Sequence, residues 1–247
     1  MTVANTIDTA EIERFSRLSA EWWEPDGPFR PLHRLNPVRI DYIRNRAAVH
    51  FRRDPRGPTP LAGLSVFDLG CGGGLVSEPM ARLGARVTAL DADANAIAAA
   101  RAHAAACAME IDYRVGGPED LAASGKRFDL VLALEVIEHV ADRAAFVAMV
   151  GALVAPGGLL ILSTLNRTMT SLVLGVGVAE YILRWVEPRT HDWRKFVRPS
   201  ELARDVRRAG FDLVDLTGLV FDPLRGAFKL KPDDVRVNYF AAAIRAD

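Results

Sequence analysis

The fold of this chain is decided by the stretch Val66-Phe67-Asp68-Leu69-Gly70-Cys71-Gly72-Gly73-Gly74-Leu75. An apolar strand runs into a cluster of glycines, and the cluster leads into a helix expected from Val76 to Leu83. This order is typical of a nucleotide-binding α/β unit. A pyrophosphate loop reads G-x-G-x-x-G, whereas these glycines read G-x-G-x-G and leucine follows. The spacing therefore disfavours a dinucleotide.

Two acids near the glycines indicate a different ligand. Asp68 stands just before the turn, where a carboxylate would repel a pyrophosphate but suits an ammonium group. Asp91 ends the next expected strand, 21 residues after Gly70. An acid at that distance accepts hydrogen bonds from ribose hydroxyls. Together with Gly70 and Gly72, these acids predict a nucleoside with an amino-acid tail, which is S-adenosylmethionine.

Two other interpretations of this stretch stay open at this point. Any α/β domain has glycine-rich turns and an acid at a strand end. A nicotinamide oxidoreductase on the same fold is the rival enzyme, although Leu75 in place of a glycine and the acid Asp68 count against it.

Composition limits the compartment and the partners. Lys and Arg together number 31, as do Asp and Glu, so no net field favours nucleic acid. Two cysteines, Cys71 and Cys107, indicate a reduced cytoplasmic setting rather than a disulfide scaffold. The N-terminus has acids at Asp8, Glu11 and Glu13 and no apolar core, so we expect no signal peptide. No uncharged run reaches the roughly 20 residues of a membrane span.

Strand and helix patterns alternate along most of the chain. This predicts an α/β fold, with a Rossmann-like, doubly wound and mostly parallel sheet of seven strands. The expected strands are Ser65–Leu69, Arg86–Leu90, Ile111–Val115, Phe128–Ala133, Leu159–Thr164, Leu213–Thr217 and Tyr239–Ile244. The expected helices between them are Val76–Leu83, Ala94–Cys107, Asp142–Val154 and one from Pro199 to Gly210.

Two parts of the chain lie outside this alternation. Residues 1–60 are expected to form an N-terminal helical lid and a linker, and residues 61–247 the main domain. A capping box at Asp8 opens the first lid helix, and Asn36 is expected to cap a second helix that starts at Pro37. An apolar insertion covers residues 168–195. Its helix Met169–Val186 has a broad apolar face, which suits either the core or a lipid interface.

Three chemically active side chains follow the fourth strand. Glu135, Glu138 and His139 stand at i, i+3 and i+4, so a helical turn would place them on one side. They could hold a divalent cation that lowers the pKa of a catechol, or His139 alone could act as a general base. Alternatively, His139 packs locally and both glutamates are solvated. His103, in an alanine-rich helix, is expected at the surface.

Several segments together resemble the ubiquinone-biosynthesis O-methyltransferases, which are class I S-adenosylmethionine-dependent enzymes. The resemblance runs from about Ile12 to Tyr239. It rests on Trp22-Trp23, on "PLHRLNPVR" at 31–39, on the glycine motif, on "EVIEHV" at 135–140, on "STLNR" at 163–167, on "AEYIL" at 179–183 and on "THD" at 190–192. The glycine motif alone indicates only a class I methyltransferase.

The resemblance implies methylation of a phenolic hydroxyl of 2-polyprenyl-6-hydroxyphenol and of demethylubiquinol. It places cofactor contacts on Arg39, Gly70, Asp91 and Leu134, with Arg39 on the methionine carboxylate and Leu134 beside the adenosine. In eukaryotic relatives a divalent cation such as Mg²⁺ occupies the positions of Glu135, Glu138 and His139. The resemblance also implies lipid contact through residues 169–186, at the cytoplasmic side of the inner membrane, and association with other ubiquinone-synthesis enzymes.

The mechanism that we expect is in-line transfer of a methyl group from a sulfonium to a phenolate, with His139 and Glu138 as catalytic residues. Two alternatives remain: an O-methyltransferase acting on another catechol or small phenol, and a lipid-surface scaffold that has kept the fold without turnover.

Overall fold

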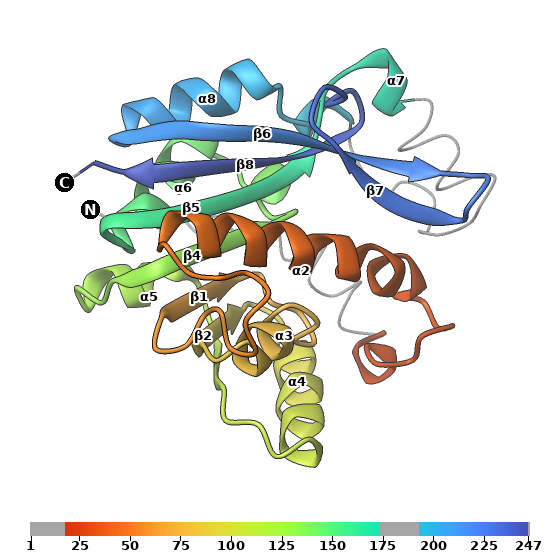
Figure 1. Ribbon diagram of the computed structural model, residues 1–247, viewed down its shortest axis with the longest axis vertical. Helices are drawn as coiled ribbons and strands as arrows, with labels where there is room; N and C mark the ends of the chain where they lie inside the picture. Colours follow the sequence, from red (N-terminus) through yellow and green to blue (C-terminus); the bar gives the residue numbers. More distant parts are fainter. Residues whose placement is uncertain (1–17, 173–192, 247) are drawn as a thin grey trace.

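The described residues of the computed structural model, 18–172 and 193–246, form an eight-stranded sheet in the order β3-β2-β1-β4-β5-β8-β6-β7 (Figure 1). The first five strands of this order run parallel, and β8 lies antiparallel between β5 and β6. The prediction of a doubly wound, mostly parallel α/β sheet is confirmed. The strands are β1 Ser65–Leu69, β2 Arg86–Asp91, β3 Asp112–Val115, β4 Phe128–Leu134, β5 Val154–Leu165, β6 Phe211–Asp222, β7 Ala227–Lys231 and β8 Asn238–Arg245.

The eighth strand, β7, was not expected from the sequence. β6 runs on as far as Asp222, and the chain turns back to pair antiparallel with it as β7. β7 reads Ala-Phe-Lys-Leu-Lys, and its residues alternate between exposed and half-buried. An edge strand of this kind has a weak apolar signal, because one of its faces and one of its sides meet solvent.

Helices cover both faces of the sheet (Figure 1). Along β1 successive side chains point to opposite faces, so Val66 and Phe67 belong to two different core clusters. Val66 packs with α2 (Arg30–His50), α3 (Ser77–Arg82) and α4 (Ala94–Ala106). Phe67 packs with α5 (Pro118–Ala123), α6 (Arg143–Ala152) and α8 (Pro199–Arg208). Short turns complete the list: η1 Ser19–Glu21, η2 Ile137–His139, α7 Met169–Ser171 and η4 Trp193–Lys195.

Helix α2 begins earlier than predicted. It starts at Arg30, with Pro31 in its first turn, so Asn36 is not its N-cap and Pro37 lies inside it. An internal proline costs about 3 kcal/mol of helix stability. Tertiary contacts offset this cost: Leu35 is buried in the core, and Asn36 Nδ2 donates a hydrogen bond to the Leu75 carbonyl at 2.6 Å.

Two predicted segments lie outside the described residues. These are the first lid helix, from Asp8, and most of the insertion helix Met169–Val186. The start of the insertion is described as α7, where Thr168 caps the helix by accepting from the Ser171 amide. Among the described helices, none has the length and hydropathy needed to cross a membrane.

Strand register brings the predicted site residues to one edge of the sheet. Leu69 of β1 is level with Leu90 of β2 and with Ala133 of β4. The residues that follow these three, Gly70, Asp91 and Leu134, therefore emerge side by side at the carboxyl end. Strand β2 lies on one side of β1 and β4 lies on the other, so the direction in which strands are added to the sheet reverses at β1. Ligands of open α/β sheets bind at such a switch point.

Candidate active site

The loop after β1 depends on glycine at Gly70. Its φ is +73°, and a side-chain carbon added there would overlap Val136. The amides of Gly70 and Cys71 both donate to the Leu90 carbonyl, at 2.8 and 3.2 Å. These bonds fix the loop to the end of β2. Backbone groups therefore shape the glycine corner, by which we mean the loop after β1 from Gly70 to Leu75 together with Asp91 at the end of β2. A substitution at Gly70 would also disturb the turn after β4.

Asp68 lies beneath this loop as a buried carboxylate. It accepts a hydrogen bond from Ser77 Oγ at 2.6 Å. Burial raises its pKa to about 6, while the Ser77 hydroxyl and the charge of Arg39 act in the opposite direction. At neutral pH the group is therefore mostly anionic. A buried anion of this kind suits a cationic ligand group such as an ammonium.

Asp91 closes the corner from the end of β2. Its Oδ2 accepts from the Gly72 amide at 2.8 Å, and its Oδ1 accepts from the Asp93 amide at 2.9 Å. Burial raises the pKa of this carboxyl, and the backbone bonds oppose the shift. Each oxygen accepts one backbone bond and keeps further acceptor capacity. The two oxygens can thus receive a pair of vicinal hydroxyls without losing the bonds that hold them.

Arg39 reaches the same region from helix α2. Its side chain is buried, and its terminal nitrogen lies 2.6 Å from Glu135 Oε1. Its Nε is also buried, without a hydrogen-bond partner. Buried donors without partners are uncommon and call for an explanation. The guanidinium thus has spare capacity for an anionic ligand group.

Glu135 does not lie on a helical turn with Glu138 and His139, as the spacing had suggested. Its φ is +56°, in the left-handed region, and helical structure begins only at Ile137. The carboxylate turns toward Arg39, and Asn238 Nδ2 donates to its Oε1 at 3.3 Å. Backbone conformations of this kind in residues other than glycine cluster at functional sites. The three side chains therefore do not share one helical face.

Glu138 is buried in the 3₁₀ turn that follows. It accepts a hydrogen bond from Thr164 Oγ1, at the end of β5, at 2.8 Å. Burial raises its pKa to about 7, the neighbouring His139 lowers it, and Glu135 raises it. His139 is half-buried, so a bound molecule can reach it. This arrangement pairs an accessible imidazole with a carboxylate that titrates near neutral pH.

The metal predicted for Glu135, Glu138 and His139 does not fit this arrangement. In the part of the chain that the structure describes, these three do not bring one donor atom each within 4.8 Å of one another. Glu135 is held by Arg39 instead. No step is therefore assigned to a cation here.

Tryptophans before α2 cover the glycine loop, a contact that the prediction of an N-terminal lid did not specify. Side-chain carbons added at Gly72 or Gly73 would overlap the indole of Trp22, so the ring lies against both residues. Trp23 Nε1 donates to the Gly73 carbonyl at 3.0 Å, and Ser19 Oγ donates to Asp93 Oδ2 at 2.9 Å. Two adjacent tryptophans ahead of a proline-rich turn were the available signal.

Leu134 is half-buried at the end of β4, level with Ser163 of β5. Leu134 therefore lies beside Gly70 at the carboxyl edge of the sheet. There its apolar side chain would contact the adenine ring of a cofactor whose ribose is bound by Asp91. Its contact with adenosine stays a prediction.

The chain is similar to known methyltransferases over nearly its whole length. A family model described as a methyltransferase domain matches residues 37–216. A protein of Cereibacter sphaeroides (strain ATCC 17025) named ubiquinone biosynthesis O-methyltransferase is 49% identical over 99% of both chains. A protein of the same name from Methylobacterium sp. (strain 4-46) is 52% identical, over 97% of this chain and 96% of its own.

Solved structures agree on the fold. Magnesium protoporphyrin IX methyltransferase from Synechocystis PCC 6803, with bound SAH, has a TM-score of 0.61 at 20% identity, covering 96% of this chain and 95% of its own. A SAM-dependent methyltransferase from Thermotoga maritima has a TM-score of 0.63 at 14% identity, covering 95% and 99%.

Proposed function

The chain belongs to the ubiquinone biosynthesis O-methyltransferases, a family of S-adenosylmethionine-dependent enzymes, and we propose a role for each site residue in methyl transfer to a phenolic oxygen. The acceptors we propose are 2-polyprenyl-6-hydroxyphenol and demethylubiquinol. The observation that carries this proposal is the turn after β4, where half-buried His139 follows Val136, the residue that lies against Gly70.

Residues of the corner after β1 and β2 would hold the cofactor. Asp91 would accept from the ribose hydroxyls, and Asp68 provides a buried negative charge for the ammonium group. Arg39 has a buried, unpartnered Nε that can meet a carboxylate. When bound, the cofactor supplies an electrophilic methyl group on a sulfonium, so these residues need only hold and orient it.

Arg39 holds Glu135 through one terminal nitrogen, so a second carboxylate on the same guanidinium would share its positive charge. A methionine carboxylate on Arg39 would compete with Glu135 for the same guanidinium. We therefore propose that cofactor binding releases Glu135 from Arg39, and that the Glu135 carboxylate then faces the acceptor side of the site.

His139 would accept the phenolic proton. A free phenol has a pKa of about 10, so a base has to remove the proton before or during transfer. The buried Glu138 carboxylate beside His139 stabilises the imidazolium that forms. Glu138 is therefore a positioning and electrostatic residue, and its effect is greatest when it is ionised.

A cation on Glu135, Glu138 and His139 is a separate proposal, supported by the resemblance alone. It requires Glu135 to leave Arg39, as cofactor binding would cause. Titrating magnesium into chelator-treated, cofactor-saturated enzyme tests this proposal. Activity that does not depend on added magnesium would contradict it.

Methyl transfer from labelled S-adenosylmethionine to a short-chain polyprenyl catechol in detergent tests the main proposal. We expect product with a free catechol and none when both hydroxyls are already methylated. Equal turnover of a small catechol without a prenyl tail would favour the alternative of a general catechol methyltransferase. No transfer to any phenol would contradict the proposal.

Contact with the membrane surface through residues 169–186 is also a proposal, and it rests on their apolar pattern and on the polyprenyl acceptor. Removing these residues should reduce flotation with anionic vesicles and leave circular dichroism of the remaining domain unchanged. Unaltered flotation would count against it.

A further inference from the structure

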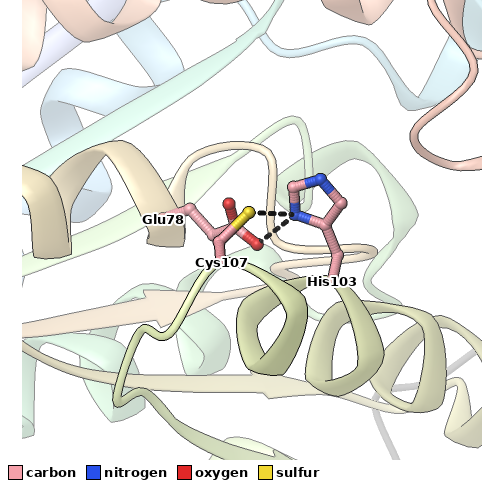
Figure 2. A group of neighbouring side chains, drawn as sticks. All are labelled: Glu78, His103 and Cys107. Atoms are coloured by element: carbon pink, nitrogen blue, oxygen red, sulfur yellow. Dashed lines mark hydrogen bonds and ion pairs between the residues drawn. The ribbon is translucent and has the colours of Figure 1, made fainter.

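A second group of metal-binding side chains lies away from the methyl-transfer site, on the face of the sheet covered by α3 and α4. Glu78 Oε1 is 2.7 Å from His103 Nδ1, and Cys107 Sγ is 3.9 Å from the same nitrogen. Figure 2 shows the carboxylate and the sulfur both directed at Nδ1, with the other ring nitrogen pointing away. One donor atom from each residue lies within 4.8 Å of the others.

Two helices bring the three residues together. His103 and Cys107 are four residues apart at the end of α4, so they lie on one side of that helix. Glu78 comes from the first turn of α3 and is fully buried, whereas Cys107 is exposed. The cluster therefore combines one buried ligand with an opening to solvent. His103, expected at the surface, is instead held on two sides.

We propose that Glu78, His103 and Cys107 form a Zn²⁺ site with a water as the fourth ligand. Tetrahedral zinc with sulfur, nitrogen and oxygen ligands needs donor separations of roughly 3.3 to 3.6 Å. The two separations here, 2.7 and 3.9 Å, lie on either side of that range. Small rotations of the Glu78 and Cys107 side chains reach it. On binding, the Cys107 thiol gives its proton to solvent, and His103 ligates through Nδ1 as the neutral tautomer that carries its proton on Nε2.

The donor set selects among metals. A thiolate and an imidazole favour zinc, whereas magnesium and calcium prefer oxygen ligands alone. The second oxygen of Glu78 is paired with Arg82 at 3.2 Å, an outer contact of the kind that orients a ligating carboxylate. The ordinary alternative is a hydrogen-bonded Glu–His pair with no ion. The geometry favours zinc because Cys107 Sγ and Glu78 Oε1 both face the same nitrogen, His103 Nδ1.

The site would also bear on the tryptophans that cover the glycine loop. The His103 ring stacks on Trp23 with the ring centres 3.5 Å apart and the planes 3° from parallel. Trp23 in turn donates to the Gly73 carbonyl. A zinc ion on His103 would therefore hold the imidazole ring in place. Trp23 packs on that ring and in turn contacts the glycine corner through Gly73.

Cobalt substitution tests the proposal without relying on activity. Reduced, metal-free full-length protein is titrated with Co²⁺ and followed in the near ultraviolet, where thiolate-to-cobalt charge transfer absorbs. We expect one equivalent to produce the band, and Zn²⁺ to abolish it. Glu135, Glu138 and His139 contain no sulfur, so cobalt bound there would give no such band.

Variants identify the ligands. Cys107→Ser, at an exposed position, should lose the band. Glu78→Gln and His103→Gln should each weaken Co²⁺ binding by about 100-fold or more, because loss of an outer contact alone costs about 10 to 100-fold. His50→Gln is the matched control: His50 bonds the Gly157 carbonyl in a distant part of the fold, and its change should leave the titration unaltered.

Trp23 supplies a second readout. Co²⁺ beside His103 should quench part of the tryptophan fluorescence, and Trp23→Phe should lose that part. Absence of the band in the unmodified protein would overturn the proposal. So would a band retained in Cys107→Ser, undiminished affinity in Glu78→Gln and His103→Gln, or equal quenching in Trp23→Phe.

Discussion

The glycine corner after β1 and the charged turn after β4 lie at the same edge of the sheet but hold their groups in different ways. In the corner, Asp91 and Gly70 are fixed by hydrogen bonds to backbone atoms. In the turn, Glu135 is held by an ion pair and Glu138 by one hydroxyl. Backbone contacts persist when a ligand arrives, whereas an ion pair can exchange partners. The corner is therefore suited to binding, and the turn to proton transfer and rearrangement.

The largest effect should separate the two regions by function. His139→Ala should lower kcat by about 10² to 10⁴-fold, the range that general-base catalysis contributes, while cofactor affinity is retained. Single-turnover methyl transfer and calorimetric titration with S-adenosylmethionine measure the two quantities. Glu138→Gln, which keeps shape and loses charge, should follow in the same direction. Equal loss of turnover and binding would refute the division.

The second-largest effect should come from a substitution that perturbs both the glycine corner and the turn after β4. Gly70→Ala places a carbon against Val136 and forces alanine to a φ of +73°. Strain and overlap together should lower the free energy of unfolding by about 3 kcal/mol. Displacement of the turn by about 1 Å should lower kcat about 10²-fold. Denaturant unfolding and turnover assays measure these changes.

Adding Val136→Ala to the Gly70→Ala variant provides the control. It removes the overlap and leaves the backbone strain, so it should restore part of both losses. No recovery in the double variant would mean that the two regions are not coupled through this contact.

A moderate effect should reveal the exchange of partners at Arg39. Glu135→Gln removes the charge that holds Arg39, so the ligand-free enzyme should lose about 1 to 3 kcal/mol of stability. Cofactor affinity should rise, because no carboxylate has to be displaced. Thermal unfolding with and without S-adenosylmethionine measures both.

Asp41→Asn supplies the comparison for that variant, since Asp41 pairs with Arg44 at the surface. Exposed pairs contribute about 0 to 1 kcal/mol, so little change is expected. Weaker cofactor binding in Glu135→Gln would contradict the proposed exchange.

The smallest effect concerns pH. Glu138 has a raised pKa of about 7, mainly from burial, and it acts as a carboxylate, so kcat should rise with pH through neutrality. Thr164→Val removes the hydroxyl that stabilises the carboxylate, which should raise that pKa and move the rise to higher pH by up to about one unit. Thr88→Val, in the distant pair with Asp112, should not move it. A shift to lower pH would exclude Glu138 as the titrating group.

Predictions from the sequence were most accurate where local backbone chemistry decides the structure. The strand before Gly70, the turn and the acid at Asp91 follow from patterns within about 25 residues, and their positions agree with the structure. Errors arose where distant contacts override local preference. Pro37 lies inside a helix because Leu35 and Asn36 are held by the core and by the glycine loop.

The alternation of strands and helices, the glycine corner and its acids could be predicted from the sequence, because they depend on neighbouring residues and on side-chain periodicity. Which charged side chains form pairs could not be predicted and became visible in the folded chain. Arg39 pairs with Glu135 across 96 positions, the left-handed backbone at Glu135 takes it off the expected helical face, and Glu78 finds His103 from another helix. Burial and partner choice depend on three-dimensional packing, which no spacing along the chain specifies.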